Sequence, residues 1–101
     1  MEVDKEKFRA WLVKHALDPV GLQSSAYDCA FARFFKEEEN AVGVVVGRTG
    51  HTLHFMDKTP VRGTNSDWMK QFIVKFDNER YRAMQLSPPR ELTGAECLAL
   101  L

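Results

Sequence analysis

The sequence lacks several features that would point to a particular class of protein. It has two cysteines, Cys29 and Cys97, far apart and outside any C-x-x-C spacing, so we expect reduced thiols and neither a disulfide framework nor a zinc-finger site. It has no net charge, because 14 Lys and Arg balance 14 Asp and Glu, which argues against long-range attraction of nucleic acid or anionic lipid. No apolar run of signal-peptide or membrane-span length follows the charged N-terminal residues. These absences predict a cytoplasmic protein without a membrane segment.

Phosphate loops and metal-ligand clusters are absent from the sequence as well. Gly43, Gly47 and Gly50 lie in or beside a predicted hairpin and lead into no helix, unlike the glycines of a phosphate-binding loop. His51 and His54 are three residues apart, as metal ligands can be, but on a strand such residues point to opposite faces. We therefore expect neither a cofactor nor a metal site.

What the chain does contain is enough apolar residues for one core. With 101 residues, of which 45% are hydrophobic and 11% aromatic, burial of side chains can offset the entropy lost on ordering the chain. We expect a single domain over residues 1–101. Its predicted class is α+β, with an antiparallel sheet of two to three strands packed against three to four helices.

Apolar residues at helical spacing predict three helices, and a capping box predicts a fourth. The expected ranges are 5–16, 26–38, 66–76 and a short helix that begins after Thr93. In the first helix His15 shares an apolar stripe with Phe8 and Leu12. We expect this histidine to pack there with a polar atom on a backbone carbonyl or water.

The start of the second helix decides where Cys29 lies. Ser25 with Asp28 fits an S-x-x-D capping box, which would start the helix at Ala26, whereas Asp28 as the N-cap would start it at Cys29. At about 100° per residue, Tyr27 falls on the apolar face and Cys29 falls opposite it. We therefore expect Cys29 near a helix start and away from the core.

From residue 41 the apolar period changes to two and predicts a β-hairpin over 42–56. A two-residue turn at Thr49-Gly50 would place Val46 opposite Leu53 on the inner face. The remaining segments are interpreted as a connector at 20–24, a loop at 57–65 and a third strand at 80–86 that could join the hairpin.

Cys29 offers one catalytic interpretation. A thiol at a helix start feels the positive end of the helix dipole, which lowers its pKa, but a cysteine hydrolase also needs a histidine base. His51 and His54 lie on the following strand, and Asp28 or Asp57 could orient one of them. No local motif marks either histidine and no oxyanion donor can be identified, so a plain thiol is the simpler interpretation.

The basic segment from Arg80 to Arg90 offers a second alternative, nucleic-acid binding. On a strand, Tyr81 would face away from Arg80 and Arg82, so base stacking and phosphate contact would not share one surface. The neutral overall charge argues further against this function. A solvated basic edge that protects an exposed strand is the simpler interpretation.

Surplus apolar residues favour protein binding instead. More of them are present than a core of three helices and three strands requires, and such residues often mark an interface. The candidates are Val45, Met56, Val74, Leu98 and Leu101. We expect a non-catalytic protein-binding module whose partner is another protein or, through the sheet edge or the C-terminal leucines, a second copy of the chain.

Three short runs add a resemblance, at residues 28–34, 44–47 and 72–77. They are similar to a pattern found in small phage and mobile-element proteins of uncharacterised function. The resemblance implies a compact α+β protein that binds host machinery, such as an inhibitor of a bacterial defence protein. It supplies no functional residues.

Overall fold

The computed structural model describes residues 3–78 and 88–101. The helices in these ranges are α1 (Lys5–Lys14), α2 (Ala30–Glu38), α3 (Asp67–Asn78) and α4 (Gly94–Leu98). The strands are β1 (Pro19–Leu22), β2 (Gly43–Val46), β3 (Gly50–His54), β4 (Val61–Thr64) and β5 (Glu91–Thr93). They form two antiparallel sheets, β2-β3-β4 and β1-β5, so the predicted α+β class is confirmed. Among the residues described, no helix has the length and apolar character that crossing a membrane requires.

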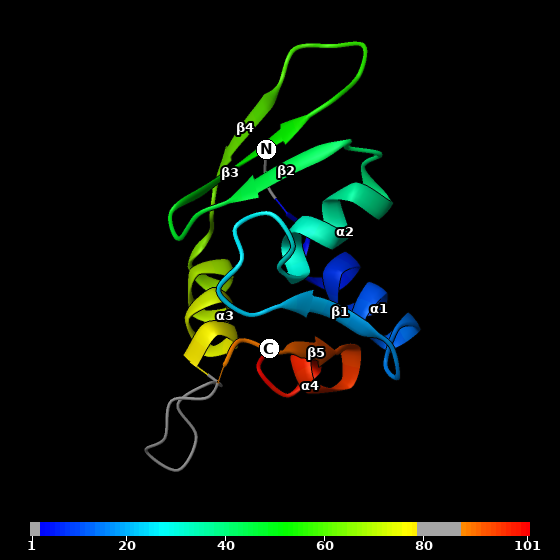
Figure 1. The fold of residues 1–101 in the computed structure, drawn as a ribbon, viewed down its shortest axis with the longest axis vertical. Helices are drawn as coiled ribbons and strands as arrows, with labels where there is room; N and C mark the ends of the chain where they lie inside the picture. The colour runs from blue at the N-terminus through cyan, green and yellow to red at the C-terminus, as the bar shows by residue number, and fades with distance from the viewer. Residues whose placement is uncertain (1–2, 79–87) are drawn as a thin grey trace.

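The two sheets lie at opposite ends of an elongated molecule of 45 × 25 × 22 Å (Figure 1). The β2-β3-β4 sheet forms one end, and β1-β5 together with α4 forms the other. Between them, α1 and α2 lie on one side and α3 on the other. The space that these three helices enclose holds the core.

An aromatic cluster joins α1, α2 and α3. Phe8 of α1 stacks on Phe31 of α2, with ring centroids 4.4 Å apart, and meets Phe72 of α3 edge-on at 5.3 Å. Fully burying one such side chain contributes about 1.5–3 kcal/mol, and aromatic pairs add to this. The predicted apolar stripes of the first and third helices are confirmed, since their buried residues are Phe8, Trp11, Leu12, Met69, Phe72 and Phe76.

The expectation of a single sheet is wrong, because segments interpreted as connections form strands. β1 replaces the connector expected at 20–24, and β4 lies inside the loop expected at 57–65. β5 pairs with β1 although the two are separated by most of the chain. Strands of three or four residues show little alternation of their own, so long-range pairing decides them. The strand expected at 80–86 lies outside the described residues.

The hairpin forms in a different register from the expected one. Val46 pairs with His51 rather than with Leu53, because the turn is centred one residue earlier, at 48–49, where the Gly47 amide donates to the carbonyl of Gly50 at 2.8 Å. The shift is by two residues, so Val46 and Leu53 still face the core. His51 is buried and His54 is exposed, which confirms that they point to opposite faces.

α2 begins at Ala30, later than expected, with Cys29 as its N-cap residue. The Oγ of Ser25 does accept a hydrogen bond from the Asp28 amide at 3.0 Å, as the capping box requires. This bond closes a turn ahead of the helix rather than its first turn. Tyr27 therefore lies outside the helix and is 66% exposed instead of lying on the apolar face.

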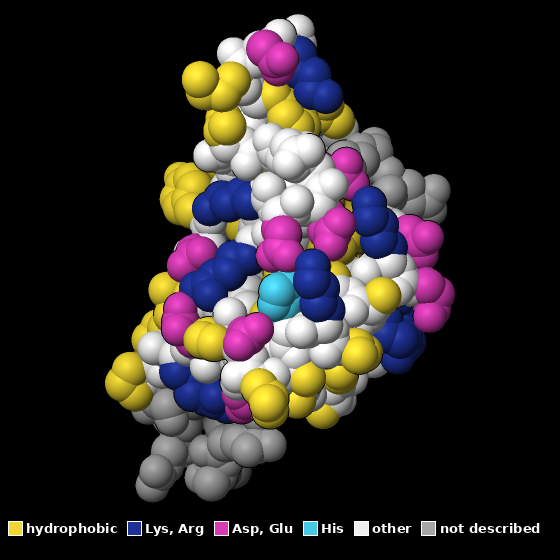
Figure 2. Space-filling view, turned by 90° about the vertical axis from the view of Figure 1, so that its right-hand side faces the viewer, with side chains coloured by type: hydrophobic (Ala, Val, Ile, Leu, Met, Phe, Trp, Pro, Cys, Tyr) yellow, Lys and Arg dark blue, Asp and Glu magenta, His cyan; other side chains and the backbone are white. Residues whose placement is uncertain are grey.

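His15 contacts two carboxylates instead of the backbone carbonyl or water expected for it. Its Nδ1 lies 3.2 Å from Asp18 and its Nε2 lies 3.0 Å from Glu37 on α2. Burial lowers the pKa of His15, but the hydrogen bonds and charges of Asp18 and Glu37 outweigh it and raise the pKa overall. Figure 2 shows the side of the molecule where α1 and α2 lie, with Lys and Arg interspersed among Asp and Glu.

The capping box predicted for the last helix is confirmed. Thr93 Oγ1 accepts a hydrogen bond from the Glu96 amide at 3.2 Å, and Glu96 Oε1 accepts one from the Thr93 amide at 3.1 Å. Gly94 follows, and its amide donates to the carbonyl of His15 at 3.2 Å. α4 is thereby held against the end of α1.

Candidate functional site

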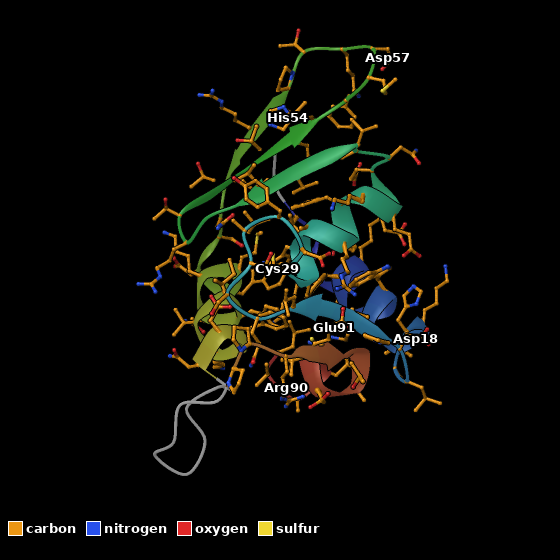
Figure 3. All side chains as sticks on the ribbon, in the orientation of Figure 1. Asp18, Cys29, His54, Asp57, Arg90 and Glu91 are labelled. Atoms are coloured by element: carbon orange, nitrogen blue, oxygen red, sulfur yellow. The ribbon has the colours of Figure 1, made fainter. Side chains whose placement is uncertain are left out.

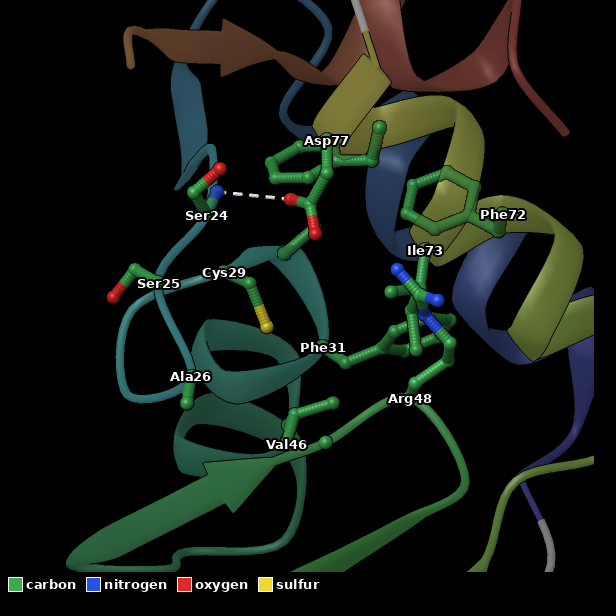
Figure 4. Close-up of a pocket in the computed structure, with 13 residues that line it drawn as sticks. Ser24, Ser25, Ala26, Cys29, Phe31, Val46, Arg48, Phe72, Ile73 and Asp77 are labelled. Atoms are coloured by element: carbon green, nitrogen blue, oxygen red, sulfur yellow. Dashed lines mark hydrogen bonds between the residues drawn. The ribbon is translucent and has the colours of Figure 1, made fainter.

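A cavity of about 360 Å³ lies where the start of α2, the end of α3 and the β2–β3 connection meet (Figure 4). Its apolar walls include Ala26, Phe31, Val46, Phe72, Ile73 and Phe76. Its other side chains include Ser24, Ser25, Cys29, Arg48 and Asp77. A concave apolar surface of this size with a few polar groups is typical of binding sites.

Hydrogen bonds to the end of α3 hold one wall of the cavity in place. Gln23 is buried, and its Nε2 donates to the carbonyl of Phe76 at 3.0 Å. The Ser24 amide donates to Asp77 Oδ1 at 2.8 Å. Ser24 has a φ of 58°, in the left-handed region that side chains other than glycine rarely adopt. The contacts on either side of Ser24 therefore keep this segment in a conformation that it would not favour alone.

A buried asparagine holds the β2–β3 connection on the opposite wall. Asn65 Nδ2 donates to the carbonyls of Gly47 at 2.8 Å and Arg48 at 3.1 Å. Because the amide group is used as the donor, Asn65 Oδ1 must accept, and it lies 2.7 Å from His51 Nδ1. This assigns the proton of His51 to Nδ1. The His51 ring also stacks on Phe35, with centroids 4.9 Å apart.

Cys29 lies in the cavity as a protonated thiol. The sequence predicted that Cys29 points away from the core. In the structure it is half-buried and packs against the core. Burial raises the pKa of Cys29 to about 11, the amides of Ala32 and Phe31 act in the opposite direction, and the charge of Asp77 raises it further. At neutral pH such a thiol is almost wholly protonated and a weak nucleophile.

The structure does not assemble Cys29 with a candidate base. The hydrogen-bond and ring contacts described for His51 are with Asn65 and Phe35. Figure 3 shows Cys29 in the middle of the molecule and His54 in the three-stranded sheet, with Asp57 farther out. No histidine is among the described residues that line the cavity. The thiol and base that a cysteine hydrolase requires are therefore not brought together.

The apolar residues predicted to bind a partner are spread over several surfaces. Val45 is exposed on β2, Met56 on the β3–β4 connection and Val74 on α3. Leu98 and Leu101 are half-buried and pack against the chain's own core. These five residues do not form one patch, and the described lining of the cavity includes none of them.

Most of the predicted nucleic-acid segment lies outside the described residues, and Arg90 is its described end. Arg90 Nη2 lies 2.8 Å from Glu96 Oε2. The hydrogen bond from Arg90 lowers the pKa of Glu96, and the Thr93 amide acts in the same direction. This arginine is therefore engaged by a carboxylate within the protein.

Sequence reasoning does not single out the charged residues of the cavity. Arg48 stands beside the expected turn at 49–50, and Asp77 belongs to the expected turn at 77–78, where polar residues are ordinary. They are separated along the chain and meet at one cavity only because α3 packs against α2 and the hairpin. No spacing in the sequence could have linked them.

Within the described ranges, no three His, Cys, Asp or Glu side chains are grouped as a metal ion would require. Comparisons with family models, with curated proteins and with solved structures give no significant match. Fold and cavity together define the class as a small α+β domain with a cavity of ligand size.

Proposed function

We propose that this chain is a non-catalytic protein-binding module whose partner inserts an apolar side chain into the cavity. The observation that carries the proposal is the cavity itself, about 360 Å³ in volume with walls held by hydrogen bonds to α3 and to Asn65. A preformed pocket lowers the entropy lost on binding and suits an anchor side chain. The raised pKa of Cys29 supports binding over catalysis at the same place.

The nature of the partner is part of the proposal. The similarity of residues 28–34, 44–47 and 72–77 to phage and mobile-element proteins favours a host protein, such as a component of bacterial defence. The two free thiols fit a cytoplasmic setting. A second copy of the chain is the alternative partner, and sedimentation of the purified protein over a range of concentrations tests for a homodimer.

Two neighbouring residues of α3 allow a matched test of the cavity. Ile73 is half-buried and lines the cavity, whereas Val74 is exposed and does not. The full chain, its Ile73→Glu variant and its Val74→Glu variant are each used to capture proteins from a bacterial lysate. We expect a stoichiometric partner with the wild type and with Val74→Glu, and its loss with Ile73→Glu, because a charge in the cavity would repel an apolar anchor.

A second variant guards against misfolding of the first. Ala26→Phe adds a ring at the cavity wall without introducing a charge, and it should abolish capture while circular dichroism and urea unfolding stay close to those of the wild type. Capture of no stoichiometric partner by the wild type would refute protein binding. Equal capture by both cavity variants would refute the cavity as its site.

A further inference from the structure

Two side chains of opposite charge line the cavity, and within the described part of the chain neither has an ion-pair partner. Arg48 belongs to the β2–β3 connection and Asp77 to the end of α3. The ion pairs described elsewhere in the molecule include neither residue, so they do not pair with each other. Figure 4 shows Asp77 beside Ser24 and Arg48 beside Ile73. Opposite charges therefore lie at separate places on the rim of an apolar cavity.

Two helix ends also lie at the cavity. Asp77 lies in the last turn of α3, where the helix dipole is negative. Cys29 and Ala30 bring the start of α2 to the cavity. The positive end of the α2 dipole therefore also lies at the cavity, on the side of Asp77, whose charge acts on the Cys29 thiol.

The carboxylate of Asp77 and the backbone that carries Arg48 are held in place before any ligand binds. The carboxylate of Asp77 is held by the Ser24 amide at 2.8 Å. The backbone of Arg48 is held by Asn65 Nδ2, which donates to its carbonyl at 3.1 Å. Charges on a fixed frame select among ligands, because a group of the wrong sign meets repulsion that the frame cannot relieve.

We infer that the cavity takes the apolar side chain of an extended partner segment in which that side chain stands between a carboxylate and a cation. The carboxylate binds Arg48 and the cation binds Asp77. On an extended segment, residues two positions apart point to the same face, so the charged residues lie two positions before and two positions after the apolar anchor. The inference rests on the proposed function and specifies the chemistry of the partner.

A segment fits this arrangement better than a free amino acid does. An α-amino acid carries its ammonium and its carboxylate on one carbon, so the two charges are adjacent. Arg48 and Asp77 come from different elements. Even the long side chain of Arg48 does not form an ion pair with Asp77. A ligand that meets both must place its charges on either side of the apolar group.

The test uses five synthetic pentapeptides with a central phenylalanine. They are acetyl-Lys-Ala-Phe-Ala-Glu-amide, its reverse, the two peptides with Lys or Glu at both ends, and a neutral peptide with Gln at both ends. Each peptide, and free phenylalanine, is titrated into the full chain, and the amide shifts of Ala26, Cys29 and Ile73 are followed by NMR. The second measurement is the protection of Cys29 from iodoacetamide. The internal control is Cys97, which is buried and is not among the described residues that line the cavity.

One of the two mixed-charge peptides should bind at least about tenfold more tightly than the like-charged and neutral ones, which corresponds to about 1.4 kcal/mol. Arg48→Gln and Asp77→Asn should each reduce this preference to less than about twofold. Asn at position 77 keeps an oxygen for the Ser24 amide, so the wall should stay in place. Arg62→Gln, on the exposed strand β4, is the matched control and should leave the preference unchanged.

Three results would overturn the inference, and they leave different parts of the proposed function standing. If the neutral peptide binds as tightly as the mixed ones, the cavity accepts an apolar anchor without selecting charge. If free phenylalanine binds more tightly than every peptide, the cavity is a small-molecule site. If no peptide shifts the cavity amides while the lysate partner is still lost with Ile73→Glu, the charge pattern is wrong and protein binding stands.

Discussion

Among single residues, Cys29 shows how burial overrides the effect of a helix start. A thiol at that position is expected to have a lowered pKa, yet desolvation raises the pKa of Cys29 to about 11. We predict that iodoacetamide alkylates Cys29 slowly near neutral pH and that the rate keeps rising through about pH 9. In urea, where the pKa returns to about 8.5, the reaction at the same pH should be faster.

Mass spectrometry of Cys29 over time measures this reaction. Cys97 serves as the control, because burial raises its pKa to about 12 and it should react more slowly still in the native protein. An alkylation rate that levels off below about pH 8 would show a lowered pKa, and it would return the hydrolase interpretation to consideration.

Asn65 is the residue on which the cavity's second wall depends. Asn65→Ala removes the donors to the carbonyls of Gly47 and Arg48 and the acceptor for buried His51. Because the buried His51 ring and two part-buried carbonyls then lose these partners, we predict a loss of about 2–4 kcal/mol in the free energy of unfolding. Urea denaturation measures the loss.

The matched control is Asn78→Ala at the exposed end of α3, which should change the stability by less than about 0.5 kcal/mol. Similar losses for the two variants would mean that the network around Asn65 contributes nothing specific.

At the scale of elements, the contact between β1 and the start of α2 leaves no room for a side chain. A Cβ added at Gly21 would overlap the backbone nitrogen of Ala30. We therefore predict that Gly21→Ala destabilises the protein by about 1–3 kcal/mol, because either β1 or α2 must shift. Thermal unfolding measures the effect. At Gly43 an added Cβ would lie 3.7 Å from the Cβ of His54, an ordinary contact, so Gly43→Ala should be tolerated and the same loss there would contradict the explanation.

Elements differ in how far the sequence predicts them. The amphipathic helices α1 and α3 carry their own signal, because residues such as Phe8 and Phe72 recur at the period of a helix face. β1, β4 and β5 carry almost none, since each is three or four residues long and is stabilised by a partner strand elsewhere in the chain. Register is not predicted either, because moving the turn by one residue shifts the pairing by two and leaves the same residues on the inner face.

At the scale of the whole molecule, His15 links α1 to α2 in a pH-dependent way. The pKa of His15 is raised by Asp18 and Glu37 despite burial. Its contribution to stability is therefore fully present below the ordinary value of about 6.5 and is lost as the pH rises through the higher folded-state pKa. We predict that the wild type loses stability relative to His15→Gln between about pH 6 and pH 8, by about 1 kcal/mol or less because the pair is partly exposed.

Urea unfolding at several pH values measures the difference between these two proteins. Glu37 makes the free energy of unfolding fall at acid pH as well. Burial raises the pKa of Glu37, but the contacts with His15 and Lys14 lower it overall. The stability that Glu37 contributes is present above its ordinary pKa and is lost as the pH falls through the lowered one. Parallel pH profiles for the wild type and His15→Gln would rule out the link.

The sequence by itself determined the α+β class, the core faces of α1 and α3 and the C-terminal capping box, because each depends on residues within a few positions of one another. The tertiary structure alone decided the two separate sheets, the burial of Cys29 and the cavity between Arg48 and Asp77. The physical reason is the distance along the chain over which each effect acts. Periodicity and capping act over one or two turns of chain, whereas desolvation and the meeting of charges depend on which distant segments pack together.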